Sequence, residues 1–139
     1  MTKIYITNMP EEYMDYENVC GPQAHSLKNI FDASCEDIVA RNILDTVPIS
    51  SVVPTLFLYM SKVKRKGKLT IGGKDIDAIV KAYKNQLLSV QDFNNLVFGI
   101  DNLSISSIVD ISNILESNGF KILSKKRDNY SWSLTAERQ

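Results

Sequence analysis

The chain has 139 residues, of which 44% are apolar, so it is long enough and apolar enough for one domain with a hydrophobic core. Lys and Arg together number 16, and so do Asp and Glu, which excludes a strong overall attraction to nucleic acid or to an anionic membrane. The two cysteines are too few for a disulfide scaffold, and no apolar run approaches the roughly 20 residues of a membrane span. We therefore expect a protein of a reducing, cytoplasmic compartment without a signal peptide.

The first third of the chain predicts two strands separated by a long loop. The segment from Lys3 to Thr7 alternates in polarity and is rich in β-branched and aromatic residues, which favours a strand. The polar segment 8–26 contains two prolines and a glycine and is predicted to be mostly loop. Residues 27–31 fit either a short strand or a turn, and the apolar run 37–40 predicts a central strand.

The clearest helix is predicted over 49–66. Ser50 or Ser51 can cap it, and its apolar stripe consists of Leu56, Met60 and Val63. Its C-terminal end carries four cations, which the helix dipole favours there: Lys62, Lys64, Arg65 and Lys66. Gly67 is then expected to end the helix with a positive φ, and residues 68–73 to form a strand.

The remaining segments predict helices followed by a hairpin. Helices are expected over 75–88, with Asp75 and Asp77 in the first turn, and over 104–118, with a buried stripe of Ile108, Ile111 and Leu115. Residues 89–99 fit a short helix or an apolar loop, and two strands flank the turn at 128–129. This order predicts an α/β fold: a mixed, mostly parallel sheet with flanking helices and a C-terminal antiparallel hairpin.

The cation cluster Lys62, Lys64, Arg65, Lys66 and Lys68 has two interpretations. A phosphate-binding loop places glycines between a strand and the N-terminus of a helix, whereas here the order is helix, glycine, strand. We therefore interpret the cluster as an exposed turn, with a patch that contacts an anionic partner as the alternative. A nucleic-acid accessory role, using this cluster and residues 125–127, is a weaker alternative that the balanced net charge disfavours.

The order of several short motifs resembles the second half of class I S-adenosylmethionine-dependent methyltransferases. In that family an acid-led strand is followed by a Leu-Glu-His segment, a helix, and a glycine turn that opens the fifth strand. The corresponding segments here are Asp37-Ile38-Val39-Ala40, Ile43-Leu44-Asp45-Thr46 and the run from Val63 to Leu69. Asp75 is similar to the acid after the fifth strand, and Asn118-Gly119-Phe120 resembles the end of the last helix. The resemblance covers roughly the C-terminal two-thirds of the chain and implies a reduced Rossmann-like fold.

The chain departs from that family where the family binds its cofactor. The cofactor site uses a glycine-rich loop after the first strand and an acid after the second strand. Only 33 residues precede Ser34, and their one glycine is Gly21. We therefore expect one domain without a cofactor, with a variable N-terminal strand and loop over 1–33 and a methyltransferase-like core over 34–139. If S-adenosylmethionine does bind, the resemblance implies that Asp37 and Asp45 lie beside it.

Other candidate chemistry is local to the N-terminal third. Cys20, His25, Asp32 and Cys35 have the residue types of a Cys–His nucleophile pair or a metal site, but neither the sequence signature nor the ligand spacing. We interpret the histidine as an ordinary loop residue and the thiols as buried or partly buried. Tyr13 and Tyr16 fit a protein-contact surface or packing over the sheet edge.

These observations predict a non-catalytic interaction or assembly subunit. A sheet that has lost strands exposes an edge, which a protein partner or a second copy can cover. The alternative is a methyltransferase whose cofactor site is completed by another chain or by an atypical N-terminal loop. The chain has 15 Ile, 12 Lys and 11 Asn, a composition that suits an AT-rich phage or bacterial genome and a virion-associated or cytoplasmic location.

Overall fold

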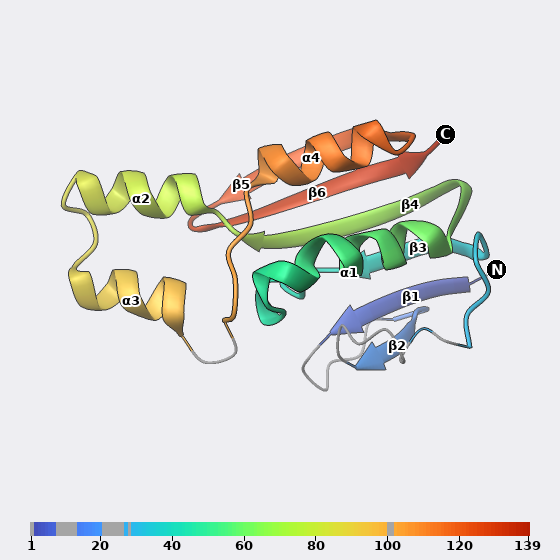
Figure 1. The fold of residues 1–139 in the computed structure, drawn as a ribbon, viewed down its shortest axis with the longest axis horizontal. Helices are drawn as coiled ribbons and strands as arrows, with labels where there is room; N and C mark the ends of the chain where they lie inside the picture. The colour runs from blue at the N-terminus through green and yellow to red at the C-terminus, as the bar shows by residue number, and fades with distance from the viewer. Residues whose placement is uncertain (1, 8–13, 21–26, 28, 100–101) are drawn as a thin grey trace.

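The computed structural model describes residues 2–7, 14–20, 27, 29–99 and 102–139. They form a six-stranded sheet with strand order β2-β1-β3-β4-β6-β5 (Figure 1). The strands are β1 (Thr2–Thr7), β2 (Glu17–Cys20), β3 (Cys35–Ala40), β4 (Val63–Lys74), β5 (Phe120–Asp128) and β6 (Ser131–Arg138). The helices are η2 (Leu44–Thr46), α1 (Ile49–Lys62), α2 (Ile76–Lys84), α3 (Val90–Phe98) and α4 (Ile108–Ser117).

The sheet topology confirms the predicted fold class. Strand β1 pairs in parallel with β2 and β3, and β3 pairs in parallel with β4. Strand β6 is antiparallel to both β4 and β5, which makes the C-terminal hairpin the reversed part of the sheet. Helix α1 connects the parallel strands β3 and β4, as predicted for a crossover.

Helices α1 and α4 pack over the same face of the sheet (Figure 1). Their buried side chains, among them Leu56, Tyr59, Ile111 and Leu115, join one apolar cluster with the inward-facing residues of the strands. All three residues of the stripe predicted for α4 are buried, and Ser107 caps this helix by accepting a hydrogen bond from the Val109 N–H. This single cluster is the core that fixes the positions of the strand ends.

The opposite face is polar over the hairpin half of the sheet. Strand β6 alternates strictly: Trp132, Leu134 and Ala136 are buried in the core, while Ser131, Ser133 and Thr135 point the other way. A strand covered on both faces reads instead as a continuous apolar run. Within the described residues, no helix covers this half on its polar side, so the sequence suits a sheet with one helical layer there.

The boundary between α1 and β4 differs from the prediction. Helix α1 ends at Lys62, and the next twelve residues belong to β4, with a shift in register against β3 around 64–67. Gly67 does not have the expected positive φ; Lys66 does, at 65°. Gly67 is needed for another reason, because a Cβ there would lie 2.8 Å from the Cys35 carbonyl oxygen. The N-cap is also different, since Pro48 and not a serine precedes the helix.

Strand β2 lies in the segment that was predicted to be loop. It has only four residues, and its partner is the parallel strand β1. The Ile30 N–H donates to the Leu27 carbonyl, so the described residues Leu27, Asn29 and Ile30 belong to a turn and not to a strand. The uncertain segment 89–99 contains helix α3.

Helices α2 and α3 form an arm beyond the carboxyl ends of β1, β3 and β4 (Figure 1). Helix α3 has no buried residue, and α2 buries only Ile79 and Ala82, outside the main core. The two helices touch through the rings of Tyr83 and Phe93, whose centroids are 5.1 Å apart. Among the described residues, none of the helices is long and apolar enough to cross a membrane.

Candidate functional site

The carboxyl end of the parallel strands is where an open α/β sheet places its ligands. Here the carboxyl ends of β1, β3 and β4 face the α2–α3 arm, which begins directly after β4 (Figure 1). We call these strand ends the carboxyl edge. Asp45, in the single turn η2 after β3, is the buried acid at this edge, with an exposed fraction of 3%. Its Oδ2 accepts a hydrogen bond from the Lys74 N–H at 2.9 Å.

The Asp45 carboxylate is only partly satisfied. Its Oδ1 has no hydrogen-bond partner among the described residues, although it is buried. Burial raises the pKa of this carboxyl group from 3.8 to about 6, against the opposing effects of the Lys74 N–H and the Lys74 charge. A Cβ on Gly73 would lie 3.0 Å from Oδ1, so the glycine leaves room for the carboxylate. A buried acid with a free acceptor oxygen is a candidate binding group.

Asp45 and Lys74 also hold the arm to the sheet. The Asp45 carbonyl accepts hydrogen bonds from the N–H groups of Leu103 and Ser104, at 2.8 and 3.2 Å. The Lys74 ammonium donates to the carbonyl of Leu96 in α3, and burial lowers the pKa of this lysine. Asp45 and the arm are therefore coupled, because Leu103 and Ser104, which follow α3 in the chain, are hydrogen-bonded to Asp45.

Asp75 has a structural role at the same edge. It is buried, and its carboxylate caps α2 by accepting a hydrogen bond from the Ala78 N–H at 3.2 Å. Arg127 Nη1 donates to both carboxylate oxygens of Asp75, at 3.0 and 2.9 Å. The prediction that Asp75 belongs to the start of this helix is confirmed, and Asp77 lies in the first turn.

The structure does not bring Asp37 and Asp45 together. Asp37 lies near the amino end of β3, and three further residues of the strand, about 10 Å of chain, separate it from the carboxyl end. The Asp37 carboxylate accepts a hydrogen bond from the Tyr16 hydroxyl, so two predicted site residues form one contact away from the edge. Of the two predicted cofactor residues, Asp45 alone lies at the carboxyl edge. Tyr13 lies outside the described residues.

The five predicted interaction cations are divided among different environments. The Lys62 ammonium is 2.7 Å from Asp32, and its side chain is 11% exposed. Lys64, Arg65 and Lys66 lie in β4 where its register shifts, and Lys66 is 3.9 Å from Glu137. Lys68 lies further along the strand, beside Asp37 in the ladder. Lys62 therefore ends helix α1, as predicted, whereas the other four cations belong to strand β4.

Two of the four residues weighed as a metal or nucleophile group can be followed here, and the described residues contain no group of three His, Cys, Asp or Glu side chains that could hold a metal ion. Cys35 is buried and free, and burial raises the pKa of its thiol. Asp32 is used by Lys62. His25 lies outside the described residues.

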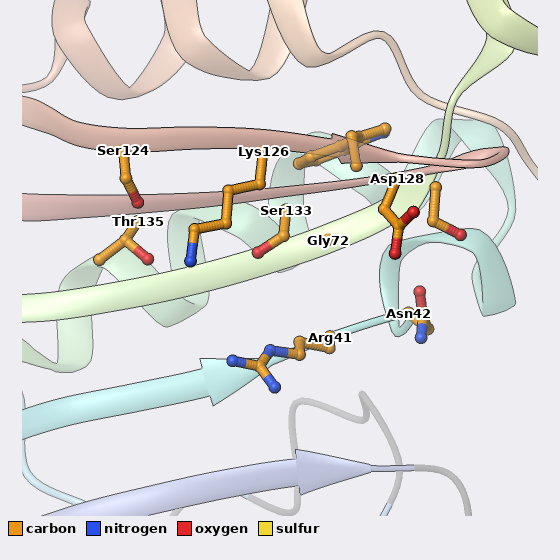
Figure 2. A pocket seen from close by; sticks show the side chains of 10 residues that line it. Arg41, Asn42, Gly72, Ser124, Lys126, Asp128, Ser133 and Thr135 are labelled. Carbon is orange, nitrogen blue, oxygen red and sulfur yellow. The ribbon is translucent and has the colours of Figure 1, made fainter.

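A polar pocket on the open face contains residues that the sequence did not single out. It has a volume of about 340 Å³ and lies over β4, β6 and β5, next to the carboxyl end of β3 (Figure 2). Its charged residues are Arg41, Lys126 and Asp128. The signal that points to it is the alternation of small hydroxyl residues in "SWSLT", which places Ser131, Ser133 and Thr135 on one face.

Comparisons of the structure with solved proteins reveal the fold. The chain superposes on a SAM-dependent methyltransferase from Archaeoglobus fulgidus with a TM-score of 0.63 and 12% identity, covering 99% of this chain and 86% of that one. It superposes on a SAM-dependent methyltransferase of Thermotoga maritima, described as a possible histamine N-methyltransferase, with a TM-score of 0.62 and 12% identity, covering 100% and 83%. No protein-family model and no curated protein sequence matches the chain.

A third similar structure is the magnesium protoporphyrin IX methyltransferase of Synechocystis with bound SAH, at a TM-score of 0.58 and 17% identity. This chain has 89% of its residues in that match but spans only 51% of the enzyme. The same enzyme is also known with SAM bound. The chain thus has the class I methyltransferase fold over nearly its whole length, not only over the predicted two-thirds.

The expectation that the chain uses no cofactor is corrected by these comparisons. Its structural neighbours are SAM-dependent enzymes, and one of them holds SAM or SAH on this fold. The expectation rested on the short N-terminal third and the missing glycine-rich loop. Strands β1 and β2 show that the first half of the fold is reduced but present.

Proposed function

We propose that the chain is a SAM-dependent methyltransferase-type protein that binds its cofactor at the carboxyl edge beside Asp45, in a site completed by another chain or by the N-terminal segment. The observation that carries the proposal is the buried Asp45 carboxylate, one oxygen of which has no partner among the described residues, at the strand ends where an open α/β sheet places its ligand. S-adenosylmethionine supplies a methyl group on a sulfonium cation. Its hydroxyl and ammonium groups are donors that match a free carboxylate oxygen.

The residues of this chain offer groups to the cofactor beside the carboxyl end of β3, but not beside that of β1. Asp45 offers the acceptor and the negative charge, and Asn42 is an exposed amide at the end of β3. Because Asp45 is 3% exposed, binding requires the packing around its carboxylate to open. On the β1 side, the described residues end at the buried Thr7, without a glycine that would let a ligand approach the backbone. This one-sided fit is the reason for proposing a second contributor.

Chemical-shift mapping of the ¹⁵N-labelled chain with the demethylated product, S-adenosylhomocysteine, tests the site. We expect the largest shifts at the amides of Asp45, Lys74, Leu103 and Ser104, because these groups share hydrogen bonds. The amides of β5 and β6 should not shift. Shifts confined to other parts of the molecule would place the ligand elsewhere and contradict the proposal.

A second candidate function, assembly, is favoured by the apolar surface of the arm. The exposed fractions of Leu87, Val90, Phe98 and Leu103 are 74, 60, 72 and 62%. Val90 and Phe98 lie on α3, which has no buried residue, and exposed apolar side chains on such a helix are typical of a contact site. The neighbouring groove on α2 carries Lys81 and Lys84, which complement an acid such as Asp92 at the start of α3. We therefore propose a second copy of the chain, with its α3 against this groove.

Sedimentation equilibrium tests this self-association. A Phe98→Ser variant should weaken it at least tenfold, whereas Phe31→Ser, at a phenylalanine that is 84% exposed and lies outside the arm, should leave it unchanged. A wild-type chain that stays monomeric at millimolar concentration would refute the proposed dimer. An interface through a sheet edge also stays a prediction; β2 and β5 are the edges, and the lysines of β5 disfavour pairing with a second β5. The cytoplasmic location and the phage or bacterial origin remain predictions.

A further inference from the structure

We propose that the polar pocket on the open face binds a small phosphorylated ligand, with its phosphate groups between Arg41 and Lys126. This site is separate from the cofactor edge and does not depend on the proposed methyltransferase function. The pocket lies on the face opposite α1, as Figure 2 shows from that side.

The floor of the pocket is a row of neighbouring residues that crosses the sheet from the end of β3, over β4 and β6, to β5. Gly72 pairs with Ser133 of β6, and Ser133 pairs with Lys126 of β5. Arg41 follows β3 on the other side, with its Cα 3.9 Å from the position of a Cβ on Gly72. At about 4.8 Å per strand, the backbones of Arg41 and Lys126 are roughly 14 Å apart. A glycine and a serine between two long cationic side chains leave the space that forms the pocket.

Gly72 has a specific role in keeping this floor flat. A Cβ there would lie 2.8 Å from the Trp132 carbonyl oxygen, so no other residue fits without a backbone shift. The Lys126 side chain extends from β5 across β6 toward β4, and the Arg41 guanidinium lies on the other side of β4 (Figure 2). The two cations therefore border the same floor from opposite sides.

Both cations are available to a ligand. Arg41 and Lys126 are exposed, and neither forms an ion pair or a hydrogen bond within the described residues. The Ser133 hydroxyl lies between them, and those of Ser124 and Ser131 line the same pocket, where they can donate to phosphate oxygens. Asp128, at the end of the pocket near the hairpin turn, repels a phosphate but can accept hydrogen bonds from sugar hydroxyls.

The ligand chemistry follows from what the pocket contains. Two separated cations and several hydroxyls suit a ligand with two phosphate groups, such as a diphosphate ester of a sugar or nucleoside. A strand of nucleic acid needs aromatic faces on which its bases stack. The one aromatic residue in the lining, Trp132, is 2% exposed, and its indole N–H is used by the Lys74 carbonyl. The geometry thus favours a small phosphorylated molecule.

Calorimetric titration with inorganic pyrophosphate tests the site. We expect saturable one-site binding that weakens with salt, and Lys126→Gln or Arg41→Gln should each reduce the affinity about tenfold. The matched control is Lys125→Gln, at the neighbouring exposed lysine of β5, which pairs with Leu134 on the helical side of the sheet and should change affinity less than twofold.

Two results would overturn the proposal. One is the absence of binding by the folded chain at 10 mM pyrophosphate, about ten-thousandfold above a micromolar Kd. The other is an equal loss of affinity in the Lys125 and Lys126 variants, which would indicate attraction of any polyanion to surface charge. A parallel titration with a single-stranded oligonucleotide should give weaker binding than pyrophosphate; tighter binding would show that the face serves nucleic acid instead.

Discussion

Asp45 is the residue on which the account of this protein depends most. The resemblance to the methyltransferase family named it, with Asp37, as a residue beside the cofactor if S-adenosylmethionine binds. The structure shows in addition that Asp45 is buried and is bonded to the arm, and that one of its carboxylate oxygens has no partner among the described residues. Its hydrogen-bond partners Lys74 and Leu103 are 29 and 58 positions away in the chain. Such long-range contacts leave no local pattern, so the sequence could not reveal them.

The raised pKa of Asp45 predicts a pH-dependent stability. The pKa of this carboxyl group is about 6 in the folded state and 3.8 in the unfolded state, so the folded chain binds the proton more tightly. Below pH 3.8 the group is protonated in both states and does not affect stability. As the pH rises from 3.8 through 6, the free energy of unfolding falls by up to about 3 kcal/mol. Asp45→Asn keeps an acceptor for the Lys74 N–H and removes the charge, so this variant should be more stable than wild type at pH 7.

Thermal unfolding of both proteins between pH 4 and pH 8 measures this effect. The difference in stability should be close to zero at pH 4 and should grow as the pH rises to 7, because only the wild-type group ionises. Asp37→Asn is the control, at a carboxylate that is only half-buried and accepts the Tyr16 hydroxyl. A difference between Asp45→Asn and wild type that does not change with pH would contradict the assigned pKa.

Local sequence patterns were sufficient to predict some of the helices and strands but not others. Helix α4 was predicted with its buried stripe, because that signal lies within one short segment. The end of α1 was missed because cations are typical of a helix C-terminus, and nothing local shows that Val63 joins a strand. Pairing with β3 makes this segment extended. Strand β2 was missed for the same reason, as its four residues, two of them polar, form a strand only beside β1.

Helix α2 provides a prediction at this scale. Asp75→Ala removes the cap on the Ala78 N–H and the partner of Arg127, and it should lower the free energy of unfolding by about 1–2 kcal/mol. Asp77→Ala, two residues later and 64% exposed in its side chain, should cost less than about 0.5 kcal/mol. Urea denaturation measures both values. Equal losses in the two variants would mean that Asp75 does not act as the cap.

At the scale of the whole molecule, the fold is a methyltransferase sheet with one helical layer over its hairpin half. The class of fold and the order of its later elements were predictable from the order of motifs. The pocket on the open face was not predictable, because the sequence pattern of a strand does not show whether its polar face is open or covered by a loop. The comparisons with solved structures also extend the match to the N-terminal strands, where the sequence carries no motif.

The measurement that tests the central claim most directly is calorimetric titration of the purified chain with S-adenosylmethionine. The account predicts one binding site per chain, with an affinity that falls about tenfold in Asp45→Asn and is unchanged in Asp37→Asn, because only Asp45 lies at the carboxyl edge. A ligand at 100 times its Kd should also stabilise the fold by about 2.7 kcal/mol in a thermal-shift control. Absence of binding at millimolar ligand, alone and with a partner chain from its source, would contradict the claim.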